Sequence, residues 1–142
     1  MFRLNLLISF ILLIIVGCDD NPMSSFPTYD FDVVMENHEI DGSDYYHLEL
    51  DSDSQTLQKL IAYTNNPNIQ KVYWEADKTY QYEYNGIMFD VDIINHASYT
   101  NSDGEAFTMF GPHPNMIGDT VTVFCYYNDN YDYSKIINII LE

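Results

Sequence analysis

The sequence predicts an all-β domain, an antiparallel β-sandwich of about seven strands. Three observations lead to this prediction. Apolar and polar residues alternate over short segments, which is the period of a half-buried strand. Turn signals rich in Asn, Asp, Gly and Pro separate these segments, and β-branched and aromatic residues are abundant within them. No segment after the N-terminal apolar run has the length and spacing of a long helix, and short strands of this kind build two packed sheets.

The alternation sets the positions of the expected strands within residues 29–142. They are residues 29–36, 46–50, 55–64, 72–76, 87–93, 105–110, 121–127 and 136–141. Residues 55–64 also contain helical spacing, but the segment is short and ends at an Asn-Asn-Pro-Asn turn, so we predict a strand. Alternation turns Trp74 inward, and residues 128–133 are expected to be a polar loop.

The N-terminus has the pattern of a secretory signal peptide. Arg3 supplies one positive charge, and residues 4–16 are almost entirely apolar. This run is shorter than the about 20 residues that cross a bilayer. The stretch Ile15-Val16-Gly17-Cys18 resembles the bacterial lipobox, in which small residues precede a cysteine that is acylated before cleavage. The resemblance implies that residues 1–17 are removed and that Cys18 carries lipid; the alternative is an uncleaved anchor with a chance Gly-Cys pair.

Residues 18–28 are expected to be the lipidated N-terminus and a short tether. Asp19 and Asp20 follow the cysteine directly. Acidic residues there resemble an inner-membrane retention signal in some Gram-negative bacteria and a surface-export signal in others. We therefore expect a lipid-anchored protein of the cell membrane or outer membrane, facing the periplasm or the cell surface.

The chain is strongly acidic. It has 22 Asp and Glu residues against five Lys and Arg, with a net charge of −17 at pH 7. Loss of residues 1–17 would remove Arg3 and no acid. Because phosphate binding needs Lys or Arg, this composition excludes nucleic acid as a partner and disfavours anionic lipid headgroups. The acids are scattered singly, which is typical of a solubilising surface.

Four segments follow one another in an order that resembles a known family. They are residues 63–69 (YTNNPNI), 72–74 (VYW), 99–106 (YTNSDGEA) and 118–123 (GDTVTV). Over residues 55–142 this order resembles the bacterial immunoglobulin-like domains of the invasin and intimin (Big-1-like) type. The resemblance implies an immunoglobulin-like sandwich that serves as a spacer, an adhesin stalk module or a binding module.

Two further expectations accompany this resemblance. Gly104 and Gly118 stand where a tight turn needs positive φ or a close backbone approach. Trp74 facing Cys125 across the core would reproduce the buried tryptophan of immunoglobulin sandwiches without their inter-sheet disulfide. Asn66 replaces a usual glycine, which is acceptable because Asn also enters left-handed conformations.

No catalytic constellation is present in the sequence. Gly-x-Ser-x-Gly, a glycine-rich phosphate loop and His-Glu-x-x-His are all missing. Cys125 lies in an apolar stretch and is expected to be a buried hydrophobe rather than a nucleophile. We therefore predict that the protein is not an enzyme. The four histidines lack metal-ligand spacing and are expected on the surface or in loops; they are His38, His47, His96 and His113.

Calcium is the one cofactor that the acidic loops could bind. Residues 51–54 (DSDS) begin like an EF-hand loop, but Thr56 replaces its glycine and Ala62 its closing glutamate. Residues 128–132 (NDNYD) could surround a cation, but we favour a solvated hairpin loop for them. We expect no metal and no other cofactor, with calcium as the alternative.

A run of tyrosines is the other possible functional signal. Tyr80, Tyr82 and Tyr84 alternate, so one strand face would present three rings suited to a protein interface or to sugar stacking. The same pattern also occurs on ordinary sandwich faces. More tyrosines lie near the last predicted hairpin, namely Tyr126, Tyr127, Tyr131 and Tyr133.

The leading hypothesis from the sequence is a non-enzymatic binding or structural module held at the membrane by lipid. Its partner would be an envelope or extracellular protein or a glycan. The alternative is a carbohydrate-binding accessory module that uses exposed tyrosines.

The lipobox predicts the consequence of removing its cysteine. Cys18→Ser should abolish metabolic labelling by palmitate, because the thiol that accepts the acylated glycerol is gone. The protein should then be released or remain as an uncleaved precursor. Cys125→Ser is the matched control and should keep its label; palmitate labelling that persists in Cys18→Ser would contradict the lipoprotein assignment.

Overall fold

The computed structural model describes residues 30–127 and 130–142, with the backbone alone for residues 130–134. The predicted signal peptide, Cys18 and the tether lie outside the described residues, as does Tyr29. Ten strands and one short 3-10 helix, η1 (Pro114–Met116), make up the regular structure of the described part. The strands are β1 (Phe31–Met35), β2 (Tyr45–Leu48), β3 (Gln58–Thr64), β4 (Lys71–Ala76), β5 (Tyr80–Tyr84), β6 (Ile87–Val91), β7 (Ala97–Tyr99), β8 (Glu105–Phe110), β9 (Thr120–Tyr127) and β10 (Asn130–Leu141).

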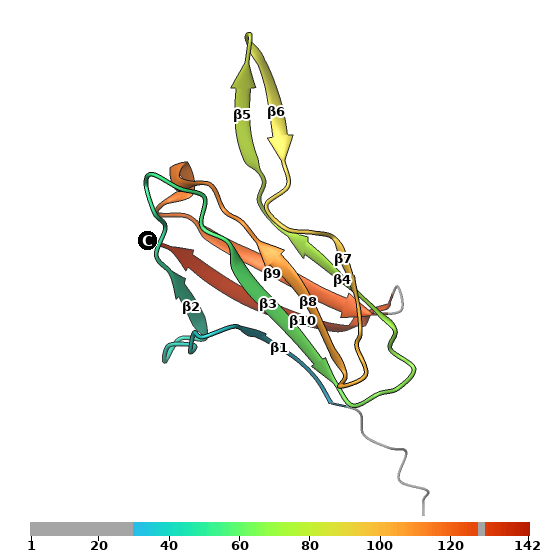
Figure 1. The fold of residues 1–142 in the computed structure, drawn as a ribbon. Coiled ribbons are helices and arrows are strands. Elements are labelled where there is room, and N and C mark those ends of the chain that lie inside the picture. The colour runs from blue at the N-terminus through green and yellow to red at the C-terminus, as the bar shows by residue number, and fades with distance from the viewer. Residues whose placement is uncertain (1–29, 128–129) are drawn as a thin grey trace, which may run out of the picture.

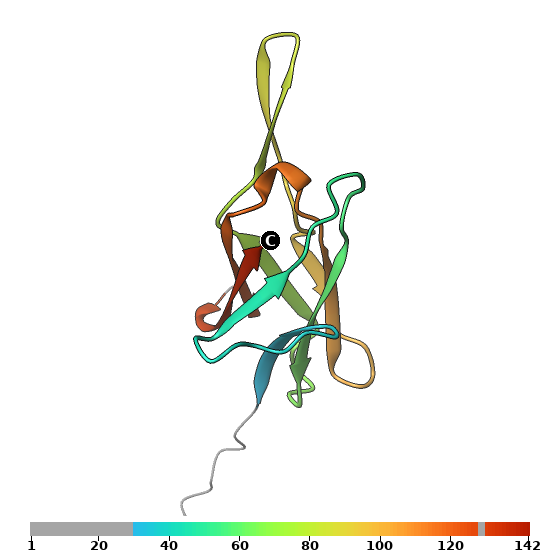
Figure 2. The same ribbon diagram turned by 90° about the vertical axis from the view of Figure 1, so that its left-hand side faces the viewer.

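Two packed sheets form an immunoglobulin-like β-sandwich (Figures 1 and 2). One sheet has the order β1-β3-β8 and the other the order β2-β10-β9-β4-β7. Every strand pair in the described chain is antiparallel except β2 with β10, which is parallel. The predicted fold class is confirmed. No described helix has the length and the apolar character needed to cross a bilayer.

The strand count exceeds the prediction of about seven. The first two predicted strands lie in different sheets, with β1 pairing β3 and β2 pairing β10. The chain turns between them with Asn37 and Asp44 at positive φ, and the Asp41 carboxylate accepts the backbone N–H groups of Ser43 and Tyr45. The strands beyond the predicted segments are β5, which forms a separate two-stranded sheet with β6 outside the sandwich, and β7, which pairs with β4 at a sheet edge.

The alternating residues of the sandwich strands fill the core as predicted. Trp74 and Val72 on β4 are fully buried. Glu75, which follows Trp74 on the same strand, is exposed. The Trp74 indole N–H donates a 2.8 Å hydrogen bond to Ser98 Oγ on β7, so its one polar atom is satisfied. Cys125 is buried, and burial raises the pKa of its thiol, which disfavours the nucleophilic thiolate.

One expected contact of Trp74 is wrong in its geometry. Cys125 does not face Trp74 across the core; it is the register partner of Trp74 on the neighbouring strand β9 of the same sheet. Their side chains lie next to each other because directly paired residues point to the same face of a sheet. Within the described residues Cys125 is free of any disulfide.

Three other local predictions concern the segment 55–64, the two turn glycines and Asn66. The ambiguous segment 55–64 is a strand, β3, and Gly104 and Gly118 both have positive φ. A side chain at Gly104 would collide with the Thr64 carbonyl oxygen. Asn66, in contrast, does not adopt a left-handed conformation.

Two predicted segments are assigned wrongly, one as a sandwich strand and one as a loop. Residues 87–93 do not form a sandwich strand, because β6 pairs only with β5. The predicted polar loop 128–133 overlaps β10, which begins at Asn130 opposite Tyr127 and resumes its pairing at Lys135 after an irregular stretch. The backbone of these residues nevertheless forms part of the strand β10.

The buried position of Trp74 predicts a large loss of stability when the ring is removed. Trp74→Ala should lower the free energy of unfolding by about 3–5 kcal/mol, because the cavity cannot collapse fully. Urea denaturation followed by circular dichroism measures this change. Tyr99→Ala, at a largely exposed aromatic residue of the adjoining strand, is the control and should change stability little. A loss below about 1 kcal/mol for Trp74→Ala would contradict its placement in the core.

Candidate binding surface

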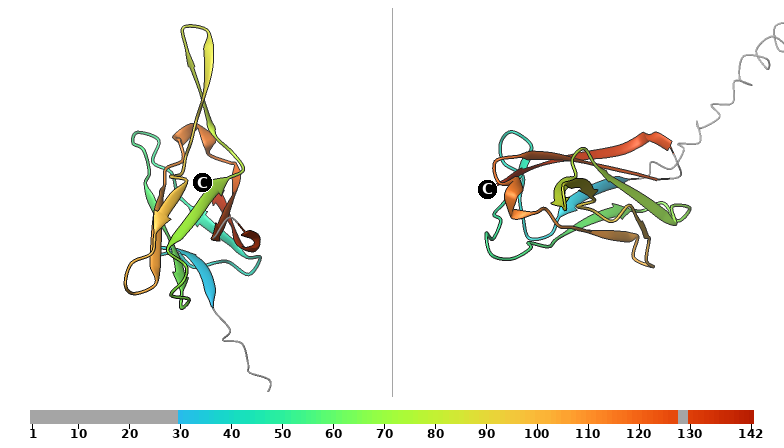
Figure 3. Two further views of the ribbon diagram at one scale, coloured as in Figure 1. Left: turned by 90° about the vertical axis from the view of Figure 1, so that its right-hand side faces the viewer. Right: turned by 90° about the horizontal axis from the view of Figure 1, so that it is seen from above.

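The β5-β6 hairpin projects from one end of the sandwich and pairs with no other strand (Figures 1 and 3). It is inserted between β4 and β7 of the five-stranded sheet. Asn85 and Gly86 form its turn, with φ values of 52° and 77°. Two successive residues at positive φ are what a tight two-residue hairpin turn requires, and Asn-Gly is its preferred sequence. The turn fixes the register, which pairs Tyr82 with Phe89.

This register gathers the apolar residues of both strands on one face. Directly paired residues share a face, so the tyrosines of β5 lie beside the aliphatic residues and phenylalanine of β6. We call this set the apolar hairpin face: Tyr80, Tyr82, Tyr84, Ile87, Phe89 and Val91. All but Tyr80 are between 45% and 59% exposed. The opposite face carries Gln81, Glu83, Met88 and Asp90.

The three predicted tyrosines therefore share a face but differ in environment. Tyr80 is half-buried at the base of the hairpin, with its ring stacked on His113 at a centroid distance of 3.8 Å and an angle of 9°. Tyr82 and Tyr84 are exposed and stack on each other at 6.5 Å and 17°. Tyr80 anchors the hairpin to the sandwich, and the other two rings are available for contact.

Sequence analysis missed half of this surface. Ile87, Phe89 and Val91 were expected to face a sandwich core, yet they are exposed. The available signal was the Asn85-Gly86 pair between two alternating runs, which predicts a hairpin in which both runs contribute to one face.

Of the tyrosines of the last predicted hairpin, the two with described side chains do not extend this surface. Tyr126 and Tyr127 are buried in β9. The Tyr126 hydroxyl donates to Glu75 Oε1 at 2.7 Å, and Tyr127 packs edge-on against Phe31. The side chains of Tyr131 and Tyr133 are not among those described.

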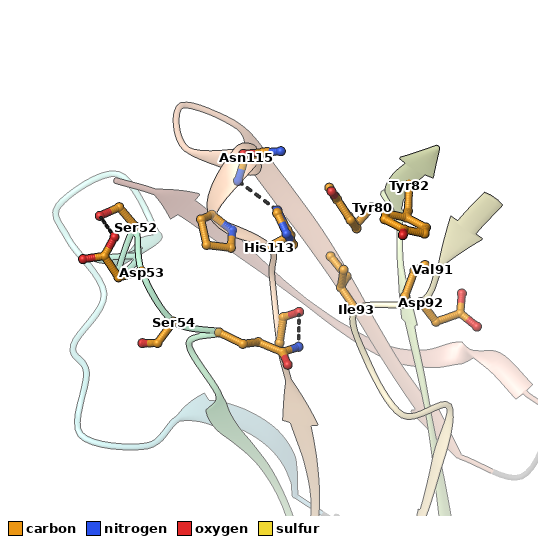
Figure 4. Close-up of a pocket in the computed structure, with 13 residues that line it drawn as sticks. Ser52, Asp53, Ser54, Tyr80, Tyr82, Val91, Asp92, Ile93, His113 and Asn115 are labelled. Atoms are coloured by element: carbon orange, nitrogen blue, oxygen red, sulfur yellow. Dashed lines mark hydrogen bonds between the residues drawn. The ribbon is translucent and has the colours of Figure 1, made fainter. Parts of the chain in front are cut away.

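A cleft of about 510 Å³ lies at the base of the hairpin (Figure 4). The loop of residues 52–55 forms one wall, Tyr80 and Tyr82 form the other, and His113 lies between them. The backbone N–H of Asn115 donates to His113 Nδ1 at 3.1 Å. Because Nδ1 accepts that bond, the proton of the neutral imidazole is on Nε2.

His96 fixes the chain where it returns from the hairpin to the sandwich. Its Nε2 lies 3.0 Å from Asp92 Oδ2, its Nδ1 lies 3.3 Å from the Trp74 carbonyl oxygen, and its own carbonyl accepts the Trp74 backbone N–H. A carboxylate and a carbonyl can only accept, so both ring nitrogens must donate. The hydrogen bond to Asp92, followed by that to Trp74, accordingly raises the pKa of His96.

The few cationic groups of the described chain are engaged within it. Lys59 pairs with Glu36 at 3.1 Å and Lys78 with Asp119 at 2.9 Å. Lys135 lies 3.7 Å from Asp32, and Lys71 lies over the ring of Tyr73. The surface presented to other molecules is therefore dominated by carboxylates.

The acidic loops show no assembled metal site among the residues that can be placed. No three or more His, Cys, Asp or Glu side chains gather there in a way that could hold an ion. In the segment 51–54 the Asp51 carboxylate instead accepts from the Asp53 backbone N–H and the Ser54 hydroxyl, which lowers the pKa of Asp51. The alternative calcium loop, residues 128–132, falls partly outside the described residues.

The remaining predicted histidines are placed without a ligand cluster in the described chain. His47 lies between Asp41 and Glu142, with ring-to-carboxylate distances of 3.1 Å and 2.7 Å. These two hydrogen bonds, that to Asp41 first, raise the pKa of His47. His38 bonds the Glu36 carbonyl oxygen.

Comparison of the chain with protein-family models, with curated proteins and with solved structures gave no match. The assignment of an immunoglobulin-like fold therefore rests on the strand order described above. Any function is inferred from the residues of this chain.

The contacts of His96 predict how it titrates. Its pKa should lie above the usual value of about 6.5. Since the pKa is raised in the folded state, the stabilisation from protonated His96 is complete below about pH 6.5 and is lost as pH rises through the folded-state pKa. An NMR titration of the imidazole signals measures this. Asp92→Asn should lower the pKa of His96, whereas the control Asp90→Asn should not; a His96 pKa at or below about 6.5 in the unaltered protein would contradict these contacts.

Proposed function

We propose that this chain is a membrane-anchored lipoprotein of the bacterial cell envelope, with a Big-1-like domain that acts as a non-enzymatic binding module. Lipid on Cys18 would hold it at the membrane, and the apolar hairpin face would contact its partner. One observation carries this proposal: five large apolar side chains are about half exposed on a hairpin that pairs with no other strand.

The energetics of an isolated hairpin support a binding role. A two-stranded ribbon alone is marginally stable in water, and it gains stability when a hydrophobic face is covered. Clustered exposed apolar groups on a soluble protein mark interaction sites, because leaving them in water forgoes about 25 cal/mol for each Å² that could be buried. A covered apolar hairpin face would recover this free energy and order the hairpin.

The position of the hairpin suits a partner away from the anchoring membrane. The first described strand, β1, begins at the end of the sandwich opposite to the hairpin (Figure 1). A lipid on Cys18 would be joined to the domain at that opposite end through a short tether. The apolar hairpin face would then be presented outward, to a protein of the envelope or of the surroundings.

A carbohydrate ligand is the second candidate, and the stacked pair Tyr82 and Tyr84 favours it. Two exposed, nearly parallel rings can lie against the apolar faces of sugar rings. Sugars, however, also need hydrogen-bonding groups beside the rings. The neighbours of this pair on the same face, Phe89 and Ile87, offer none, and polar groups adjoin only Tyr82, in the cleft at the hairpin base. The composition of the apolar hairpin face therefore favours a protein.

The double substitution Tyr82→Ser/Phe89→Ser tests the proposal. It removes the central cross-strand pair of the apolar hairpin face and should abolish partner capture, while the thermal transition of the sandwich stays within a few degrees. Capture is measured in living cells by placing a photo-crosslinking amino acid at Ile87 and detecting the crosslinked adduct.

The matched control is Tyr99→Ser/Phe107→Ser, which removes one exposed tyrosine and one exposed phenylalanine from the sandwich strands. This control should keep the adduct. Equal adduct yields from both double variants would contradict the proposal. Binding of the unaltered chain to a neutral glycan on an array, lost in Tyr82→Ser/Tyr84→Ser, would instead select the carbohydrate alternative.

A further inference from the structure

The cleft at the hairpin base and the apolar hairpin face form one continuous surface. Tyr80, Tyr82 and Val91 belong to both. A polypeptide segment lying along the apolar hairpin face toward the sandwich would therefore run into the cleft. What the cleft can accept is set by the groups at its end.

Those groups favour a cation. Asp53 and Asp92 line the cleft, and no lysine or arginine does so. Asp92 is already bonded to His96, whereas Asp53 accepts only a 3.3 Å hydrogen bond from the Ser52 hydroxyl among its described side-chain contacts and belongs to no described salt bridge. The Asp53 carboxylate is thus the group available to pair with an incoming positive charge.

The aromatic wall reinforces this preference. A guanidinium or ammonium group is attracted to the face of a tyrosine ring, and arginine stacks on such rings particularly well. The Tyr82 ring lies in the cleft wall opposite the Asp53 loop (Figure 4). A long basic side chain could place its methylene groups against Ile93 and Tyr82 and its charged end near Asp53.

We propose that the occupant is an extended segment of a basic protein, with apolar side chains on the apolar hairpin face and one arginine or lysine in the cleft beside Asp53. This inference rests on the proposed function and specifies its partner. Charge complementarity supports it, because the chain carries a net charge of −17 and its described lysines are engaged internally. The same charge opposes a second copy of this chain, since two such surfaces repel.

Selection from a library of random peptides tests the proposal without knowledge of the partner. The full chain in detergent micelles is panned, and recovered peptides are sequenced. Peptides that bind should combine apolar residues with arginine or lysine. In a recovered peptide made synthetically, replacing the basic residue with glutamine should weaken binding about tenfold, as measured by fluorescence anisotropy.

Variants of the chain locate this effect. Asp53→Asn/Tyr82→Ser should reduce the difference between the basic peptide and its glutamine form to about twofold or less, because the groups that recognise the cation are gone. Glu39→Gln, which removes one exposed acid outside the cleft, is the control and should keep the full difference. A difference that persists in the double variant, or recovered peptides without basic residues, would overturn the inference.

Two further comparisons separate the possible failures. If peptides require Tyr84 and Phe89 but show no preference for a cation, the inference fails and the proposed function stands. If no recovered peptide depends on those residues, both fail. Free spermidine that binds the chain as tightly as the basic peptide would assign the cleft to a small cation and overturn the inference as well.

Discussion

Burial of Trp74 is the constraint on which the arrangement of this domain depends. The ring lies in β4 with no exposed surface, beside Cys125 of β9. Its indole N–H needs an internal acceptor, and Ser98 Oγ on β7 supplies it. The backbone of Trp74 also pairs with the carbonyl of His96. The same residue therefore joins β4 to the edge strand β7 of the five-stranded sheet and fixes the point at which the chain returns from the hairpin.

The contacts of Trp74 explain how the hairpin can project although it pairs with no other strand. The chain leaves β4 for the hairpin and returns through His96 and Ser98, both bonded to Trp74. Stacking of Tyr80 on His113 attaches the outgoing strand. The base is consequently held on both sides by the sandwich, and the residues beyond it are free to present the apolar hairpin face. Rigid elements that support an exposed contact surface are the usual arrangement in binding modules.

Much of the sandwich was predictable because its strands follow the local rule of alternation. Val72, Trp74, Val121 and Val123 could each be assigned to the buried face from the pattern alone. The parallel pairing of β2 with β10 could not, because it joins residues about ninety positions apart and leaves no local signal. Placement of β1 and β2 in different sheets follows from that pairing.

The candidate surface was only partly predictable for a related reason. Alternation shows that two faces differ, but it does not say whether the apolar face is covered. Tyr82 and Tyr84 were singled out correctly as a shared face, whereas Ile87 and Phe89 have the same pattern as a core strand. Only the three-dimensional position of the hairpin distinguishes the two cases. The cleft with Asp53 and His113 is formed by loops that are distant in sequence, so no sequence pattern predicts it.

Hydrogen exchange of the full chain tests most directly whether the hairpin stands uncovered. Amides of β5 and β6 should exchange about a hundredfold or more faster than those of β4 and β9, because opening a two-stranded ribbon exposes no core. Addition of a captured partner should slow the exchange of the hairpin amides and leave those of β9 unchanged. Protection of β5 and β6 equal to that of β9 in the isolated protein would contradict the account, since the apolar hairpin face would then already be packed.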